Sequence, residues 1–174
     1  MEFYIAQGIS ILTAIVAILS MQMKSMKGIL ITQIAANLLA SSTYFILGGF
    51  SGAGISLIAI IQLIVVFLYN INDKEPHKFL VIPFIIAYTT YSIFYFKSFI
   101  DIFPLLAAIF FALGIAQKKP SVFRIYGMLN PLCWLVYDIY NLALVNSLMR
   151  LGIFISALIA KIKLDGFMRH KKNN

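Results

Sequence analysis

Long apolar stretches, separated by short polar or glycine-rich connections, dominate the chain. Each stretch approaches the roughly 20 residues that a helix needs to cross the hydrocarbon core of a bilayer. A membrane β-barrel would instead show short segments in which apolar and polar residues alternate. The pattern predicts an all-α integral membrane protein with seven transmembrane helices, over residues 3–22, 29–47, 53–71, 79–96, 99–116, 125–145 and 148–162.

The composition excludes an ordinary water-soluble globule. Hydrophobic residues make up 61% of the 174 residues and charged residues only 11%, whereas about a quarter of a soluble domain is charged. Seven helices leave only short loops, so there is no room for a separate catalytic or nucleic-acid-binding domain. The expected surroundings are the lipid bilayer, with no nucleic acid as a partner.

The basic residues are distributed unevenly between the two sides of the predicted bundle. Of the fourteen Lys and Arg residues, only Lys97 and Arg150 fall on the side that holds the N-terminus. The others lie in the opposite loops, including Arg124 in a predicted loop over 117–124, or near the C-terminus. Cytoplasmic loops carry the excess of Lys and Arg. The N-terminus is therefore predicted outside and the C-terminus in the cytoplasm, which requires an odd number of helices.

An internal repeat is indicated when the chain is shifted by 93 residues. Asn37 then falls on Asn130, and Tyr44 falls on Tyr137. Chance is the alternative explanation. Two three-helix repeats in the same orientation need one extra helix between them, which gives a three-plus-one-plus-three arrangement with parallel repeats. The predicted units are 1–71 (first bundle), 72–97 (linker helix), 98–163 (second bundle) and 164–174 (a frayed, basic cytoplasmic tail).

Several short stretches resemble the YgjV family of bacterial inner membrane proteins. They are Ala6-Gln7-Gly8, Leu39 through Leu47-Gly48 to Gly52-Ala53-Gly54 and Ile60, and Cys133-Trp134. The resemblance implies a place near the SWEET, SemiSWEET, PQ-loop and PnuC transporters, and hence the same three-plus-one-plus-three fold. The chain departs from that superfamily in lacking any Pro-Gln dipeptide. It also offers Gln62 and Ser156 where the SWEET facilitators use an Asn in the third helix of each bundle, which puts the SWEET pattern of sugar transport in doubt.

Polar and aromatic residues form a stripe on each of two predicted helices related by the repeat. Residues three and four apart share one helical face, and polar side chains inside a membrane need partners. A cavity between the two helices would explain both stripes, although Asn can also join helices and Tyr and Trp often lie at the bilayer interface. The candidate substrate-binding residues are Gln33, Asn37, Tyr44, Asn130, Trp134, Tyr137 and Asn141.

Asp138 is the one acidic residue predicted deep within a helix. Intramembrane acids usually mark substrate pathways or proton relays, so Asp138 is a candidate for coupling transport to a proton or cation. The structural alternative is an ion pair with Arg150 at the start of the last helix.

Two prolines are candidate hinges for alternating access. Pro104 and Pro131 fall within predicted helices, where proline frees a backbone carbonyl and favours a kink. A static kink is the alternative. The polar stretch 88–92 in the linker helix covers every face of that helix, so it is interpreted as linker packing.

No sequence motif indicates an enzyme, a cofactor or a metal site. The chain lacks the HExxH and GxSxG patterns and a phosphate-binding glycine loop, and His77 and His170 lie outside the predicted helices. Cys133 is the single cysteine. We therefore expect a non-enzyme without cofactor or metal.

The favoured hypothesis is an inner-membrane transporter or facilitator of a small neutral or weakly charged solute. Two three-helix bundles would rock about a midplane site, in a monomer or a homodimer. The alternative is a non-transporting receptor, scaffold or assembly protein on the same fold. A sealed core would favour this alternative, whereas a continuous polar cavity open to one side would favour transport.

Overall fold

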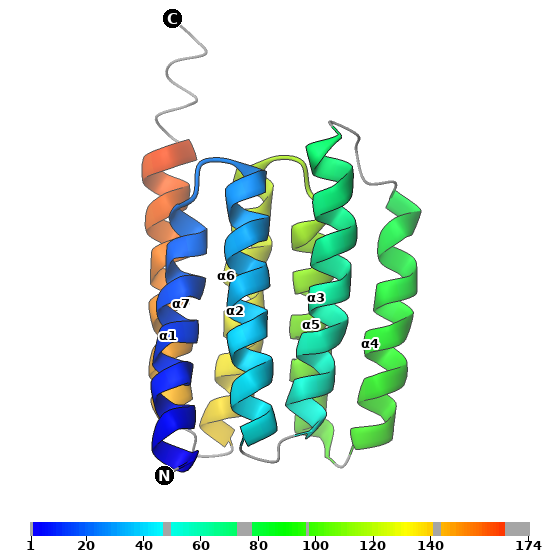
Figure 1. The fold of residues 1–174 in the computed structure, drawn as a ribbon, viewed down its shortest axis with the longest axis vertical. Coiled ribbons are helices and arrows are strands. Elements are labelled where there is room, and N and C mark those ends of the chain that lie inside the picture. The colour runs from blue at the N-terminus through cyan, green and yellow to red at the C-terminus, as the bar shows by residue number, and fades with distance from the viewer. Residues whose placement is uncertain (1, 47–49, 73–77, 97, 141–143, 166–174) are drawn as a thin grey trace, which may run out of the picture.

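A computed structural model describes residues 2–46, 50–72, 78–96, 98–140 and 144–165. These residues are all helical apart from short turns, and they form seven α-helices (Figure 1). The helices are α1 (Glu2–Gln22), α2 (Met26–Ile46), α3 (Phe50–Ile71), α4 (Val81–Tyr95), α5 (Ile102–Ile115), α6 (Pro120–Tyr140) and α7 (Leu144–Ala160).

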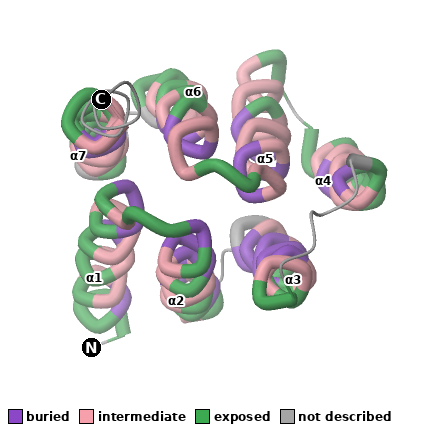
Figure 2. Tube along the Cα trace, turned by 90° about the horizontal axis from the view of Figure 1, so that it is seen from above, coloured by how far each residue is buried: buried purple, intermediate pink, exposed green. Residues whose placement is uncertain are grey.

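The helices stand roughly side by side in two layers of three. α1, α2 and α3 form one layer, and α7, α6 and α5 form the other, with α2 and α6 in the central positions (Figure 2). Each central helix packs against both neighbours in its layer, and the layers meet where α1 contacts α7 and α3 contacts α5. α4 lies beside α3 and α5, outside the two layers.

The outer surface of the bundle is apolar. Large side chains such as Phe94, Tyr4 and Phe99 are 77% to 80% exposed, which is typical of a surface that faces lipid. By length and composition, three helical segments can each cross a membrane, namely Glu2–Gln22, Met26–Ile46 and Ala53–Ile71. Val81–Tyr95 and Phe99–Ile115 are shorter apolar helices.

The predicted boundaries of the last two helices were wrong. α6 begins at Pro120 rather than at 125, because proline has a backbone angle suited to the first helical turn and needs no donor there. The predicted helix 125–145 also ran too far, since α7 already begins at Leu144. The segment 142–145 reads Leu-Ala-Leu-Val, so hydropathy alone does not mark the connection.

The predicted loop over 117–124 and the predicted C-terminal tail over 164–174 were also partly wrong. Arg124 is not in a loop but in the second turn of α6, and its side chain is fully buried. The chain after α7 continues as a π-helical turn over Lys161–Asp165, and Asp165 forms an ion pair with Arg124. The first residues of the predicted frayed tail therefore belong to the folded body.

Two apolar clusters hold the bundle together. The larger one joins α1, α2, α3, α5, α6 and α7 near the end that carries the α1–α2 turn, with Leu30, Leu63 and Ile115 completely buried. The second joins α3, α4 and α5 around Tyr88, which is 1% exposed. Residues of both clusters also line the cavity described next.

Candidate functional site

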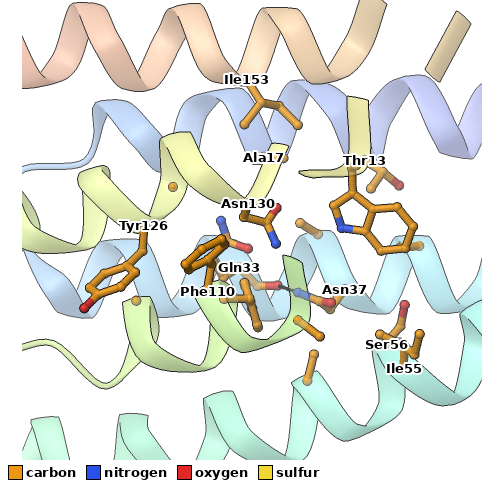
Figure 3. Close-up of a pocket in the computed structure, with 18 of the residues that line it drawn as sticks. Thr13, Ala17, Gln33, Asn37, Ile55, Ser56, Phe110, Tyr126, Asn130 and Ile153 are labelled. Carbon is orange, nitrogen blue, oxygen red and sulfur yellow. Dashed lines mark hydrogen bonds between the residues drawn. The ribbon is translucent and has the colours of Figure 1, made fainter. Parts of the chain in front are cut away.

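A cavity of about 170 Å³ lies between the two layers. Its walls come from both central helices and from α1, α3, α4, α5 and α7 (Figure 3). The polar lining consists of Thr13, Gln33, Asn37, Tyr44, Ser56, Tyr88, Tyr126, Asn130 and Arg150, together with the Trp134 indole. Six of the nine residues predicted to bind substrate or to form the coupling pair, Gln33, Asn37, Tyr44, Asn130, Trp134 and Arg150, therefore line one cavity.

The amide groups in this cavity are held in defined orientations. The Nδ2 of Asn37 donates a hydrogen bond of 2.9 Å to the Gln33 carbonyl, and the Nδ2 of Asn130 donates one of 2.8 Å to the Ala107 carbonyl. The Nε2 of Gln33 donates to the Ser20 hydroxyl at 2.8 Å. A backbone carbonyl can only accept hydrogen bonds, so neither asparagine amide can be flipped without losing its bond.

These anchors leave the amide oxygens as acceptors at the cavity. Within the described part of the chain, no donor reaches the side-chain oxygen of Gln33, Asn37 or Asn130. All three residues line the cavity, and Figure 3 shows Asn130 on the opposite wall from Gln33 and Asn37. The cavity therefore presents acceptors that a solute with O–H or N–H groups can satisfy.

Aromatic and cationic side chains complete the lining. The guanidinium carbon of Arg150 lies 4.9 Å from the centre of the Trp134 ring, a cation–π distance. Tyr137 does not line the cavity, but its ring meets Trp134 edge to face, with ring centres 6.0 Å apart. Tyr137 thus contacts a residue of the lining.

A second cavity of about 230 Å³ adjoins the first one. It lies between α1, α2 and α7, and its additional lining includes the polar residues Gln7, Ser10, Thr43 and Asn146. The two cavities share the residues Thr13, Ala17, Ala40, Tyr44, Arg150 and Ile153. Together they extend from the centre of the bundle towards the end at which α1 and α7 begin.

The other predicted site residues have separate outcomes. Asn141 and the side chain of Asp138 lie outside the described parts of the structure, so the coupling role of Asp138 and its pairing with Arg150 stay predictions. Pro104 is in the first turn of α5, where proline causes no kink. Pro131 is fully buried inside α6, and its role as a hinge stays a prediction.

Sequence analysis missed Tyr88 as a cavity residue. The stretch 88–92 was interpreted as linker packing, but the Tyr88 side chain lines the cavity from α4. Small residues on the neighbouring helices, Ala59, Ala108 and Ala112, surround it. Its hydroxyl is buried and has no hydrogen-bond partner among the described residues. The sequence carries no periodic signal for Tyr88, because the stretch 88–92 is polar on every face of its helix.

Phe110 and Phe111 of the lining were also missed, because they lie on a helix for which no stripe was predicted. No group of three metal-binding side chains occurs in the described segments.

Comparison with known families finds a match over residues 4–166 to Imp-YgjV, described as a bacterial inner membrane protein. No curated protein and no solved structure matches the chain. The match and the apolar helices identify a multi-pass protein of the bacterial inner membrane, as predicted. The resemblance to the YgjV family is therefore confirmed, whereas its placement beside the SWEET and PQ-loop transporters stays a prediction.

Proposed function

Because this chain belongs to the Imp-YgjV family of bacterial inner membrane proteins, we propose that it transports a small neutral or weakly charged solute by alternating access. In this proposal all seven α-helices cross the bilayer. The N-terminus faces outward and the C-terminus faces the cytoplasm, as the distribution of Lys and Arg predicts.

The placement of the helices supports a pair of parallel repeats. α1 stands diagonally opposite α5, and α3 stands diagonally opposite α7, with α2 facing α6 (Figure 2). A two-fold axis along the membrane normal would exchange these pairs. Parallel repeats of this kind have substrate sites near the midplane, between the repeats.

The observation that carries the proposal is the cavity shared by Asn37 and Asn130. These residues correspond to each other in the repeat, they come from facing helices, and they line the same space. Both present an amide oxygen there, so the preferred solute is one that donates hydrogen bonds. The adjoining second cavity supports transport over a sealed receptor or scaffold, because it extends the polar lining towards one end of the bundle.

The proposal can be tested by ligand binding to the purified protein. A solute that binds only the folded state raises the apparent stability, so thermal unfolding is measured with sugars, nucleosides, vitamins and amino acids. Trp134 is the single tryptophan and lines the cavity, so its fluorescence gives a second, independent signal of binding. We expect a hit to raise the unfolding temperature and to change this fluorescence.

The variants that test the site are Asn37→Ala and Asn130→Ala, each of which should abolish the response to the hit. Asn72→Ala is the matched control, because exposed Asn72 also bonds a carbonyl four residues earlier, that of Leu68 at 2.7 Å. An equal loss in all three variants would contradict the site. A sharp unfolding transition with no hit across the panel would favour the receptor or scaffold.

A further inference from the structure

The side chain of Arg124 joins three separate parts of the chain at one end of the bundle. Its Nε donates to the Met21 carbonyl at 3.1 Å, and one Nη donates to the Met23 carbonyl at 2.7 Å. The other Nη binds the carboxylate of Asp165. The guanidinium is fully buried, so its surroundings fix its position.

These contacts link the two helix layers. Met21 is in the last turn of α1, in the first layer, and Met23 directly follows this helix, whereas Arg124 and Asp165 belong to the second layer. The last carbonyls of a helix have no partner within that helix, and a cation at this end also favours the helix dipole. Arg124 therefore caps α1 from the opposite layer.

Other polar contacts reinforce this end. Lys161 donates to the Ser121 hydroxyl at 2.7 Å and lies 3.3 Å from Asp165. Gln22 of α1 donates to the Ser156 hydroxyl of α7 at 2.7 Å, and this hydroxyl donates to the Ile18 carbonyl at 3.1 Å. The larger apolar cluster lies at the same end.

The opposite end of the bundle has a different character. The second cavity lies there, and it shares walls with the central cavity. In the described structure, hydrogen bonds, ion pairs and apolar packing thus close the Arg124 end, whereas a cavity extends towards the other end. In the proposed topology, the Arg124 end faces the cytoplasm.

We propose that Arg124 and Asp165 form the latch that holds the cytoplasmic gate of this transporter closed. This inference rests on the proposed function. The carbonyls of Met21 and Met23 hold Arg124 against α1, while Asp165 neutralises its charge and ties it to the chain after α7. Loss of the carboxylate leaves a buried cation without its counter-ion, which disfavours the closed state.

The latch is tested by measuring how fast a cysteine in the cavity reacts from each side of the membrane. Ala17 lines both cavities, so Ala17→Cys is the reporter, in a Cys133→Ser background. A membrane-impermeant methanethiosulfonate reagent is added to spheroplasts, to reach the outer side, and to inside-out vesicles, to reach the cytoplasmic side. We expect the background protein to react about tenfold faster from the outside, because one closed gate protects the reporter.

Asp165→Asn is the informative variant, since Arg124→Ala would also remove the cap of α1. It should raise the rate from the cytoplasmic side by about tenfold and lower the rate from the outside. Asp165→Glu keeps the carboxylate and should stay near the background rates. Lys163→Ala is the control for a change of one charge at an exposed side chain of the same turn, and it should change neither rate.

An unchanged cytoplasmic rate in Asp165→Asn would overturn the latch, and so would an equal increase in Lys163→Ala. The outer rate of the background protein separately tests the access route of the proposed function. A reporter that is unreactive from the outside would contradict that route. The cytoplasmic rates of Asp165→Asn and of the background protein would still show whether the latch exists.

Discussion

Replacing Tyr88 by phenylalanine should stabilise the solute-free protein. The Tyr88 hydroxyl is buried and unpartnered within the described structure, and the residue is 1% exposed. A buried polar group without a partner costs about 1–3 kcal/mol. Phenylalanine keeps the ring among the small residues of α3 and α5 and removes only the hydroxyl, so we expect a gain of about 1 kcal/mol.

The assay is thermal unfolding in detergent, followed by the fluorescence of the single tryptophan. For a chain of this size, 1 kcal/mol changes the unfolding temperature by roughly 2–4 °C. Tyr91→Phe is the control on the same helix, because the Tyr91 hydroxyl has a hydrogen bond with Tyr95. That variant should lose stability, by about 1 kcal/mol.

Tyr88→Phe should weaken the binding of a solute found in the ligand screen, although it stabilises the solute-free protein. If the hydroxyl bonds the solute, its removal should weaken binding by up to about tenfold, the equivalent of 1.4 kcal/mol. A lower unfolding temperature for solute-free Tyr88→Phe would refute the reasoning, since it would mean that the hydroxyl already has a partner.

Three further changes are expected to have defined effects. Gly114→Ala should lower stability by about 1–3 kcal/mol, because the new Cβ would lie 2.9 Å from a tyrosine Cβ on α6. Gly8→Ala is its control, because Gly8 has open space around it, and this variant should be neutral or slightly stabilising in the same thermal unfolding assay. Ser156→Ala should cost about 1–3 kcal/mol because its hydroxyl joins α7 to α1, whereas Ser42→Ala, whose hydroxyl bonds only its own helix, should unfold at nearly the parental temperature. Asp138→Asn should remove any dependence of solute uptake on a pH gradient, and unchanged uptake across pH would exclude the coupling role.

Much of the fold could be predicted because a membrane-spanning helix must satisfy its own backbone hydrogen bonds. That requirement produces long apolar runs, and the first five helices follow them within about three residues, a usual boundary error. The connection between α6 and α7 was missed because it is itself apolar. The start of α6 was missed because the charge of Arg124 suggested a loop, although Pro120 marked a helix start.

The site could be predicted only where polar residues repeat along one helix. The stripes of α2 and α6 identified Asn37 and Asn130, and both residues line a common cavity because the central helices of the two layers face each other. The roles of Tyr88 in the cavity lining and of Arg124 as the cap of α1 depend on contacts between segments far apart in the chain. The pattern of residues along a single helix does not predict that the end of α1 contacts α6, or that α4 packs against α3 and α5.

The position of α4 makes the central site asymmetric. Two equivalent layers alone would offer a solute two equal orientations, exchanged by the axis between them. Tyr88 enters the lining from α4, which stands on one side of the layers (Figure 2). One of the two orientations therefore brings a solute hydroxyl or amine to Tyr88, and the other does not. An unsymmetrical solute would be held with the same side turned towards α4 each time, a preference that a dimer of identical three-helix halves could not provide.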